Sequence, residues 1–228
     1  MAAAPAPAGS QASVAAIAEL SAALADVADA VRPGHLGERT PCSRFSVAGL
    51  LAHLAYSLGS CERAARKDAA FDTARGAQPG AAPTTARDVA RDVAPSTARD
   101  VAAASRRTGA AWQRPEALLG STEFGLVPGR ARGPEKLPAA FAVLVTVQEL
   151  GLHGWDLASS IGLPFRVSQE TGRVLVEAVG VFAARARPSG SYGPALDVSP
   201  NAPALLRALA ASGRSPSWSS RPRLRPVD

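Results

Sequence analysis

The stretch Glu149-Leu-Gly-Leu-His-Gly-Trp-Asp156 places a carboxylate and an imidazole four residues apart, directly after the apolar run 137–147. At about 100° per residue, helix positions i and i+4 lie on one face, so the pattern predicts that Glu149 and His153 point the same way from a core helix. A glutamate in apolar surroundings is costly unless it is neutralised, paired or bound to a cation. A divalent metal ion bound by both side chains would offset that cost.

A second apolar helix supplies a third candidate ligand, His53. This helix is expected to begin after Ser46, a good N-cap residue, and its aliphatic residues recur with helical period at 47, 50, 51, 54 and 58. His53 lies roughly 110° from the middle of that stripe, at the flank of the buried face. Two histidines and one glutamate leave a fourth position open, as in catalytic zinc sites. Each residue alone is better explained by ordinary packing, so the metal interpretation depends on the three together.

Several segments resemble the signatures of one protein family. They are 40–47 with 50–54, 149–158, and 192–218. In this order they are similar to the T-P-C-x-x-W-x-V…L-x-x-H-L motif, the E-x-x-x-H-x-W-D-L-A motif and the closing segment of short members of the mycothiol-dependent maleylpyruvate isomerase N-terminal family. The resemblance implies a DinB-like four-helix bundle. It also implies that His53, Glu149 and His153 bind a divalent metal, usually zinc.

The resemblance is less specific for the reaction. Phe45 stands where the family usually has tryptophan, and Gly49 stands where an acidic residue is common. In the isomerase itself, a further C-terminal domain supplies a basic catalytic residue. No arginine of this chain matches that residue, so the catalytic residues stay unassigned.

The composition is that of a helical protein with a core of small aliphatic side chains. The 228 residues are 46% hydrophobic but only 5% aromatic, and no apolar run reaches the ~20 residues of a membrane span. The net charge is +6, but the arginines are scattered without any nucleic-acid-binding motif, so neither nucleic acid nor membrane is an expected partner. Cys42 and Cys61 are expected to be structural thiols. We expect a cytoplasmic protein, and the preference for arginine over lysine fits an actinobacterial source.

Periodicity and Gly/Pro punctuation predict an all-α fold, a DinB-like up-and-down four-helix bundle with a C-terminal helix and tail. The bundle helices are expected at about 11–31, 47–67, 98–112 and 138–161, and further helices at about 168–185 and 204–211. The metal is expected between the second and fourth bundle helices, near one end of the bundle.

The remaining segments complete the predicted organisation. A linker is expected at 76–84, a short slippage repeat at 85–102 and a loop at 120–134. The predicted domains are a disordered leader at 1–10, the metal-binding bundle at 11–218 and a basic tail at 219–228.

The predicted function is metal-dependent chemistry with mycothiol as cosubstrate, because a coordinated thiol is deprotonated at neutral pH. The partners would be this small thiol and an electrophilic substrate, which is isomerised or receives the thiol. The alternative is a non-catalytic metal-binding regulator or partner module. A bundle that keeps only the fold is disfavoured, because all three candidate ligands (the triad His53, Glu149 and His153) are present. Asp156 is expected either to orient an imidazole or to tie helices together. The chain is expected to be a monomer or a homodimer.

Overall fold

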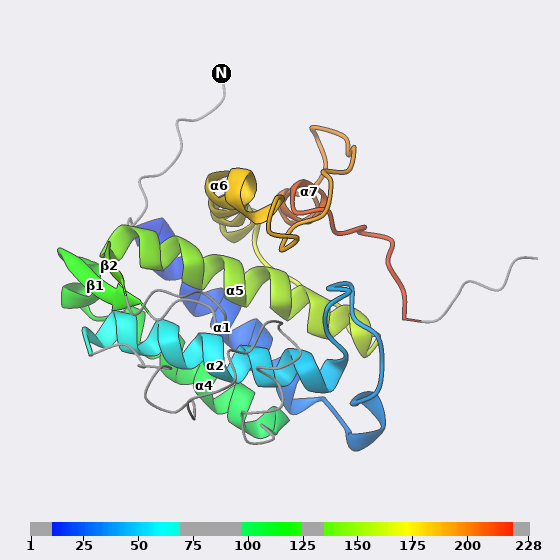
Figure 1. Ribbon diagram of the computed structural model, residues 1–228, viewed down its shortest axis with the longest axis horizontal. Coiled ribbons are helices and arrows are strands. Elements are labelled where there is room, and N and C mark those ends of the chain that lie inside the picture. The colour runs from blue at the N-terminus through cyan, green and yellow to red at the C-terminus, as the bar shows by residue number, and fades with distance from the viewer. Residues whose placement is uncertain (1–10, 69–96, 125–134, 221–228) are drawn as a thin grey trace, which may run out of the picture.

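The computed structural model describes residues 11–68, 97–124 and 135–220, and its described part is built mainly from helices (Figure 1). The main elements are α1 (Gln11–Asp29), α2 (Val47–Arg66), α4 (Ala98–Trp112), α5 (Ala139–Ser160), α6 (Gln169–Ala186) and α7 (Ala204–Ala211). Short elements are the 3-10 helices η1 (Pro33–His35) and η3 (Pro115–Leu118) and the strands β1 (Ser121–Phe124) and β2 (Glu135–Pro138). The all-α class is confirmed, and every predicted helix is present with ends within two residues of those expected.

Several predicted segments lie outside the described residues. They are the leader 1–10, the linker 76–84, the part of the repeat before 97, the part of the predicted loop at 125–134 and the tail after 220. The last unit of the repeat, beginning at Thr97, forms the start of α4.

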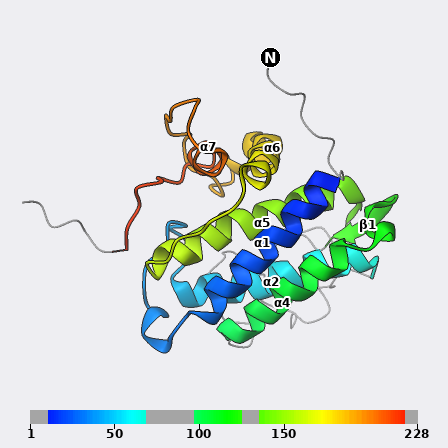
Figure 2. The same ribbon diagram turned by 180° about the vertical axis from the view of Figure 1, so that it is seen from behind.

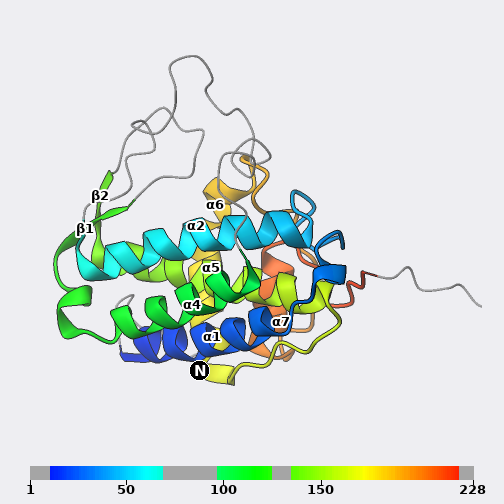
Figure 3. The ribbon, with the colours of Figure 1, turned by 90° about the horizontal axis from the view of Figure 1, so that it is seen from below.

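Four helices form the bundle, and their directions differ from the predicted up-and-down order. α1 and α2 each pack against both α4 and α5, as Figure 3 shows. Lys67 Nζ donates to Ala117 O at 2.9 Å, and Thr122 Oγ1 donates to Ala64 O at 2.7 Å, so the ends of α2 and α4 lie together. α2 and α4 therefore run parallel. In a parallel pair, the connecting segment must lead from the end of the first helix back to the start of the second. The hydrophobic periodicity of the helices does not show whether a connection does this.

Local signals in the sequence set the helix ends. Ser46 Oγ accepts a hydrogen bond from Gly49 N at 3.3 Å, and Ser168 Oγ accepts one from Thr171 N at 3.2 Å, so both serines cap the helices that follow them. Lys67 adopts a left-handed conformation with φ of 62° and ends α2.

The centre of the bundle is filled by aliphatic residues that are at most 1% exposed, such as Leu20, Leu24, Leu50, Leu54, Leu58, Val147 and Leu150. One described helix, α1, is long and apolar enough by length and composition to cross a membrane, and 50% of that window is buried inside the fold. Its apolar face packs against α4 and α5, as expected for a core helix (Figure 2).

A small antiparallel hairpin precedes α5, where a loop was predicted over 120–134. β1 pairs with β2 so that Ser121 lies opposite Pro138 and Phe124 lies opposite Glu135. The prediction was wrong for 121–124 because so short a strand has no clear alternation of polar and apolar residues. A tertiary contact holds it instead, through the Thr122 hydroxyl on α2.

The last two helices lie on one side of the bundle. α6 packs against α1 and α5, and α7 packs against α6 (Figure 1). The close approach of α6 to α5 requires Gly151, because a Cβ there would lie 2.8 Å from the Leu175 methyl carbons. The segment after α7 then returns to α5 and reaches the candidate site.

Candidate metal centre

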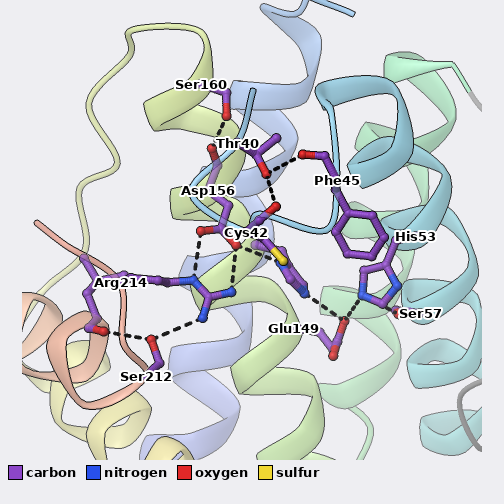
Figure 4. Close-up of polar contacts among 12 residues, drawn as sticks. Thr40, Cys42, Phe45, His53, Ser57, Glu149, Asp156, Ser160, Ser212 and Arg214 are labelled. Carbon is purple, nitrogen blue, oxygen red and sulfur yellow. Dashed lines mark hydrogen bonds and ion pairs between the residues drawn. The ribbon is translucent and has the colours of Figure 1, made fainter. Parts of the chain in front are cut away.

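Three ionisable side chains from α2 and α5 converge: His53, Glu149 and His153. Figure 4 shows the first two of them facing each other. One donor atom of each lies within 4.8 Å of the other two. His53 Nε2 is 3.1 Å from Glu149 Oε2, and His153 Nε2 is 4.0 Å from the same oxygen. The side chains are 20%, 14% and 12% exposed in that order, so solvent reaches the cluster. The structure thus brings the three predicted residues together, and their role as metal ligands stays a prediction.

The local sequence explains this convergence. Glu149 and His153 are one turn apart in α5 and point the same way, as the i, i+4 spacing predicts. In α2 the buried stripe of leucines turns into the core, which leaves His53 at the flank that faces α5. The packing of two apolar helices therefore supplies the site without any special backbone conformation.

The protonation states of the cluster suit a cation. Burial by itself would raise the pKa of Glu149, but the neighbouring His53 and His153 outweigh it and lower that pKa to about 2. Burial lowers the pKa of His153, although Asp156 and Glu149 act in the opposite direction. At neutral pH the site therefore holds a carboxylate and a neutral imidazole, which are the forms that bind divalent metals.

Asp156 connects this cluster to the C-terminal segment. Its side chain is fully buried, and its Oδ2 lies 2.9 Å from His153 Nδ1. Arg214 donates to both carboxylate oxygens, from Nε to Oδ1 and from Nη2 to Oδ2, each at 2.8 Å (Figure 4). Burial alone would raise the pKa of Asp156, but Arg214 keeps it below its usual value. Asp156 thus contacts an imidazole, as one of the two alternatives expected, and its other contact is to the segment after α7 rather than to a second helix.

An aromatic ring from the loop before α2 covers His53. Phe45 stacks on the imidazole with ring centroids 5.0 Å apart and an angle of 22° between the planes. The Thr40 hydroxyl fixes the loop, because its Oγ1 lies 2.7 Å from Cys42 O and 2.9 Å from Phe45 O. Phenylalanine in place of the usual tryptophan therefore keeps a stacking partner for His53.

Neither cysteine has the character of a nucleophile. Burial and the Asp156 carboxylate raise the pKa of the Cys42 thiol. Cys61 is fully buried in α2, and burial raises its pKa to about 12.

A second group of possible metal ligands consists of Cys42, His153 and Asp156, whose donor atoms also lie within 4.8 Å of one another. Because Arg214 already occupies both oxygens of Asp156, this second group is not a good metal site.

The first cluster fits a divalent metal. Two imidazole nitrogens and one carboxylate oxygen form a donor set that zinc accepts, among other first-row metals. The donor separations of 3.1 and 4.0 Å suit ligands that each lie about 2.0–2.2 Å from one ion. Metal-binding histidines usually donate their second nitrogen to a carboxylate, and His153 has such a partner in Asp156.

The fold and this cluster define a class of protein, a four-helix bundle with a candidate metal centre between two of its helices. The family model described as mycothiol maleylpyruvate isomerase N-terminal domain matches residues 17–158. The chain belongs to this family, as the resemblance in its motifs predicted. The match contains the three candidate ligands and Asp156, and it ends before α6. Comparison with curated proteins and with solved structures gives no match.

Sequence reasoning missed Arg214. This residue follows a glycine after a short helix, where no periodic pattern indicates burial. Its guanidinium nevertheless is buried, with 6% exposure. One signal was available: a buried Asp156 needs a cationic partner, and the arginines of the closing segment were the candidates.

Proposed function

We propose that this protein holds a divalent cation, zinc, at His53, Glu149 and His153 and uses mycothiol as a cosubstrate. The observation that carries the proposal is the convergence of one ionised carboxylate and two imidazoles within 4.8 Å of one another. Membership of the mycothiol-related family supports the choice of thiol.

The residues of the site would act together in the following way. His53, Glu149 and His153 would hold the cation, Asp156 would orient His153, and Phe45 would restrict the His53 ring. A zinc ion bound there supplies positive charge that favours the thiolate form of a thiol at neutral pH. The reaction class that we propose is addition of this thiolate to a small electrophile such as an activated alkene, in which the C–S bond forms as the C=C π bond opens to an enolate. Rotation about the resulting single bond and loss of the thiolate would isomerise a maleylpyruvate-like substrate, whereas uptake of a proton from solvent by the enolate would complete thiol transfer.

The surroundings of the triad favour thiol addition over hydrolysis. Hydrolysis needs a free base that activates water. In the part of the chain that the structure describes, two acid–base groups beside the triad are already engaged. Asp156 is bound by Arg214, and Tyr192 donates its hydroxyl to Gln148 Oε1 at 2.7 Å. A thiol would need no such base, because a bound cation would favour its anion and the thiol proton would be released to solvent.

We also propose that the protein acts in the cytoplasm. Cys42 and Cys61 are free thiols, which suits a reducing compartment, and a small thiol cosubstrate is kept reduced there.

The test is metal analysis of the purified protein followed by calorimetry with mycothiol. We expect one zinc ion per chain and, in two buffers of different ionisation enthalpy, release of about one proton per bound thiol at pH 7. The reason is that a free thiol, with a pKa of about 8.5, is mostly protonated at this pH. A chelator should abolish the binding, whereas Cys42→Ser and Cys61→Ser should keep it. A zinc-loaded protein that binds no mycothiol would contradict the thiol proposal and favour a metal-binding regulator or partner module.

A further inference from the structure

Arg214 lies outside the family-matched region yet reaches the candidate metal centre. The match covers 17–158, whereas Arg214 follows α7. Its guanidinium is 6% exposed, and the Asp156 carboxylate that it binds is fully buried. The two hydrogen bonds from Nε and Nη2, each 2.8 Å long, form a bidentate pair. A buried charge pair of this kind is costly to form, so it calls for a role beyond packing.

The backbone around Arg214 is shaped to deliver it. Gly213 ends α7 with a φ of 80°, a left-handed conformation that favours glycine. A Cβ at Gly213 would lie 2.5 Å from Gly193 Cα, so the two loops can cross only without a side chain there. Arg214 N donates to Leu209 O at 2.9 Å, and Arg214 Nη1 donates to Ser212 Oγ at 3.2 Å. These contacts hold the side chain in one direction, toward α5.

The Arg214–Asp156 pair determines which nitrogen of His153 carries the proton. Asp156 Oδ2 accepts from Arg214 Nη2 and also faces His153 Nδ1 at 2.9 Å. An ionised carboxylate only accepts hydrogen bonds, so the proton of a neutral imidazole must be on Nδ1. The lone pair is then on Nε2, the nitrogen that lies 4.0 Å from Glu149 Oε2. The bidentate contact also fixes the orientation of the Asp156 carboxylate, because it engages both oxygens.

We propose that Arg214 is a positioning residue, which fixes the Asp156 carboxylate against His153 Nδ1 and thereby holds His153 in the Nδ1–H tautomer with Nε2 free for the site. The C-terminal segment thus completes a centre whose candidate ligands all come from the family-matched bundle. The effect on metal binding rests on the proposed function, whereas the tautomer does not.

The tautomer is measured first, in the metal-free protein. Long-range ¹H–¹⁵N spectra of the histidine rings at pH 8 distinguish the two neutral tautomers. We expect His153 in the wild-type protein as Nδ1–H, and a mixture of tautomers in Arg214→Met. An Nε2–H tautomer in the wild type would overturn the proposal, and this measurement needs no variant to fold.

Zinc affinity is measured second, by competition with a chromophoric chelator. Loss of an outer partner of a metal-bound histidine typically costs about 10- to 100-fold in affinity, so we expect that range for Arg214→Met and a smaller loss for Arg214→Lys. If Arg214→Met does not fold, Arg214→Lys carries the comparison. Arg187→Met is the matched control, because Arg187 Nη2 donates to Ala211 O at 2.8 Å and so ties the same segment without touching Asp156.

The outcomes separate the two proposals. An unchanged tautomer with zinc affinity within about twofold of wild type in the Arg214 variants would overturn the role of Arg214, as would an equal loss in Arg187→Met. A wild-type protein that binds no divalent metal would overturn the proposed function, and the tautomer in the metal-free protein would still decide the role of Arg214.

Discussion

The contact of α1 with α4 and the contact of α2 with α5 use buried polar groups in opposite ways. Between α1 and α4, Ser105 Oγ donates to Ser21 O at 2.8 Å. Between α2 and α5, the polar groups include a partly exposed ionisable pair, His53 and Glu149, which lie 3.1 Å apart across the interface. The first contact pairs the Ser105 hydroxyl with a backbone carbonyl, whereas the second places a carboxylate beside a titratable side chain.

This difference separates a packing surface from a functional one. Removing a hydroxyl that donates to a backbone carbonyl changes the packing and stability of the contact and no other property. A largely buried carboxylate beside two imidazoles is costly, and it is retained where it serves a function. Substitutions in the two contacts should therefore differ in their main effect, which is on stability in the first contact and on metal affinity in the second.

The largest effect is expected from Glu149→Gln in the α2–α5 contact. Loss of a direct ligand should reduce zinc affinity by more than the roughly 10- to 100-fold that an outer partner costs. The metal-free protein should also lose some stability at pH 8, because the lowered pKa of Glu149 means that the folded state favours its carboxylate, although glutamine keeps the shape of the side chain. Chelator competition and thermal unfolding of the metal-free protein measure the two properties separately.

The matched control is His35→Gln, since His35 is a solvent-accessible histidine in η1 whose Nδ1 accepts only a local hydrogen bond from Arg32 N. It should keep zinc affinity. A Glu149→Gln variant with full zinc occupancy would show that Glu149 is not a ligand.

A smaller effect, of the opposite kind, is expected from Gly109→Ala in the α1–α4 contact. An added Cβ would lie 2.8 Å from Ser21 Cβ, so the helices must separate. Overpacking of this kind typically costs about 1–3 kcal/mol, and we expect a loss of stability in that range with zinc affinity unchanged. Urea unfolding of the metal-free protein measures it. Combining Gly109→Ala with Ser21→Gly should recover part of the lost stability. If the free-energy changes of the two substitutions simply add, residues 21 and 109 are not in direct contact.

The sequence predicted those features that depend on short-range pattern. Ser46 and Ser168 cap their helices as expected, and the apolar periods identified all the main helices of the described chain. Glu149 and His153 could be paired because they share one helix face. His53 joined them through its place on a second apolar helix and through the family resemblance.

The features that were not predicted depend on contacts between distant segments. The parallel direction of α2 and α4 is fixed where Lys67 and Thr122 bridge their ends, and the hairpin strand β1 is held by the same bridge. The burial of Arg214 follows from its pairing with Asp156 across 58 positions in sequence. No local period carries such information.

The smallest effect is expected from Glu19, which extends the comparison to the outer side of α1. Glu19 accepts hydrogen bonds from Ser168 N at 2.6 Å, from Ser168 Oγ at 2.7 Å and from Thr171 Oγ1, and so ties α1 to the start of α6. Partial burial would raise the pKa of Glu19, but these hydrogen bonds outweigh it and lower the pKa.

A carboxyl group whose pKa is lowered in the folded state stabilises the fold at pH values above its unfolded-state pKa. This contribution is lost as the pH falls through the folded-state pKa. Stability of the metal-free wild type should therefore fall on acidification below about pH 4.5, the usual value for glutamate, and Glu19→Gln should make that fall less steep. Thr171→Val, which removes one donor, should give an intermediate slope in urea unfolding at a series of pH values. An unchanged slope in Glu19→Gln would mean that the α1–α6 contact is held by apolar packing alone.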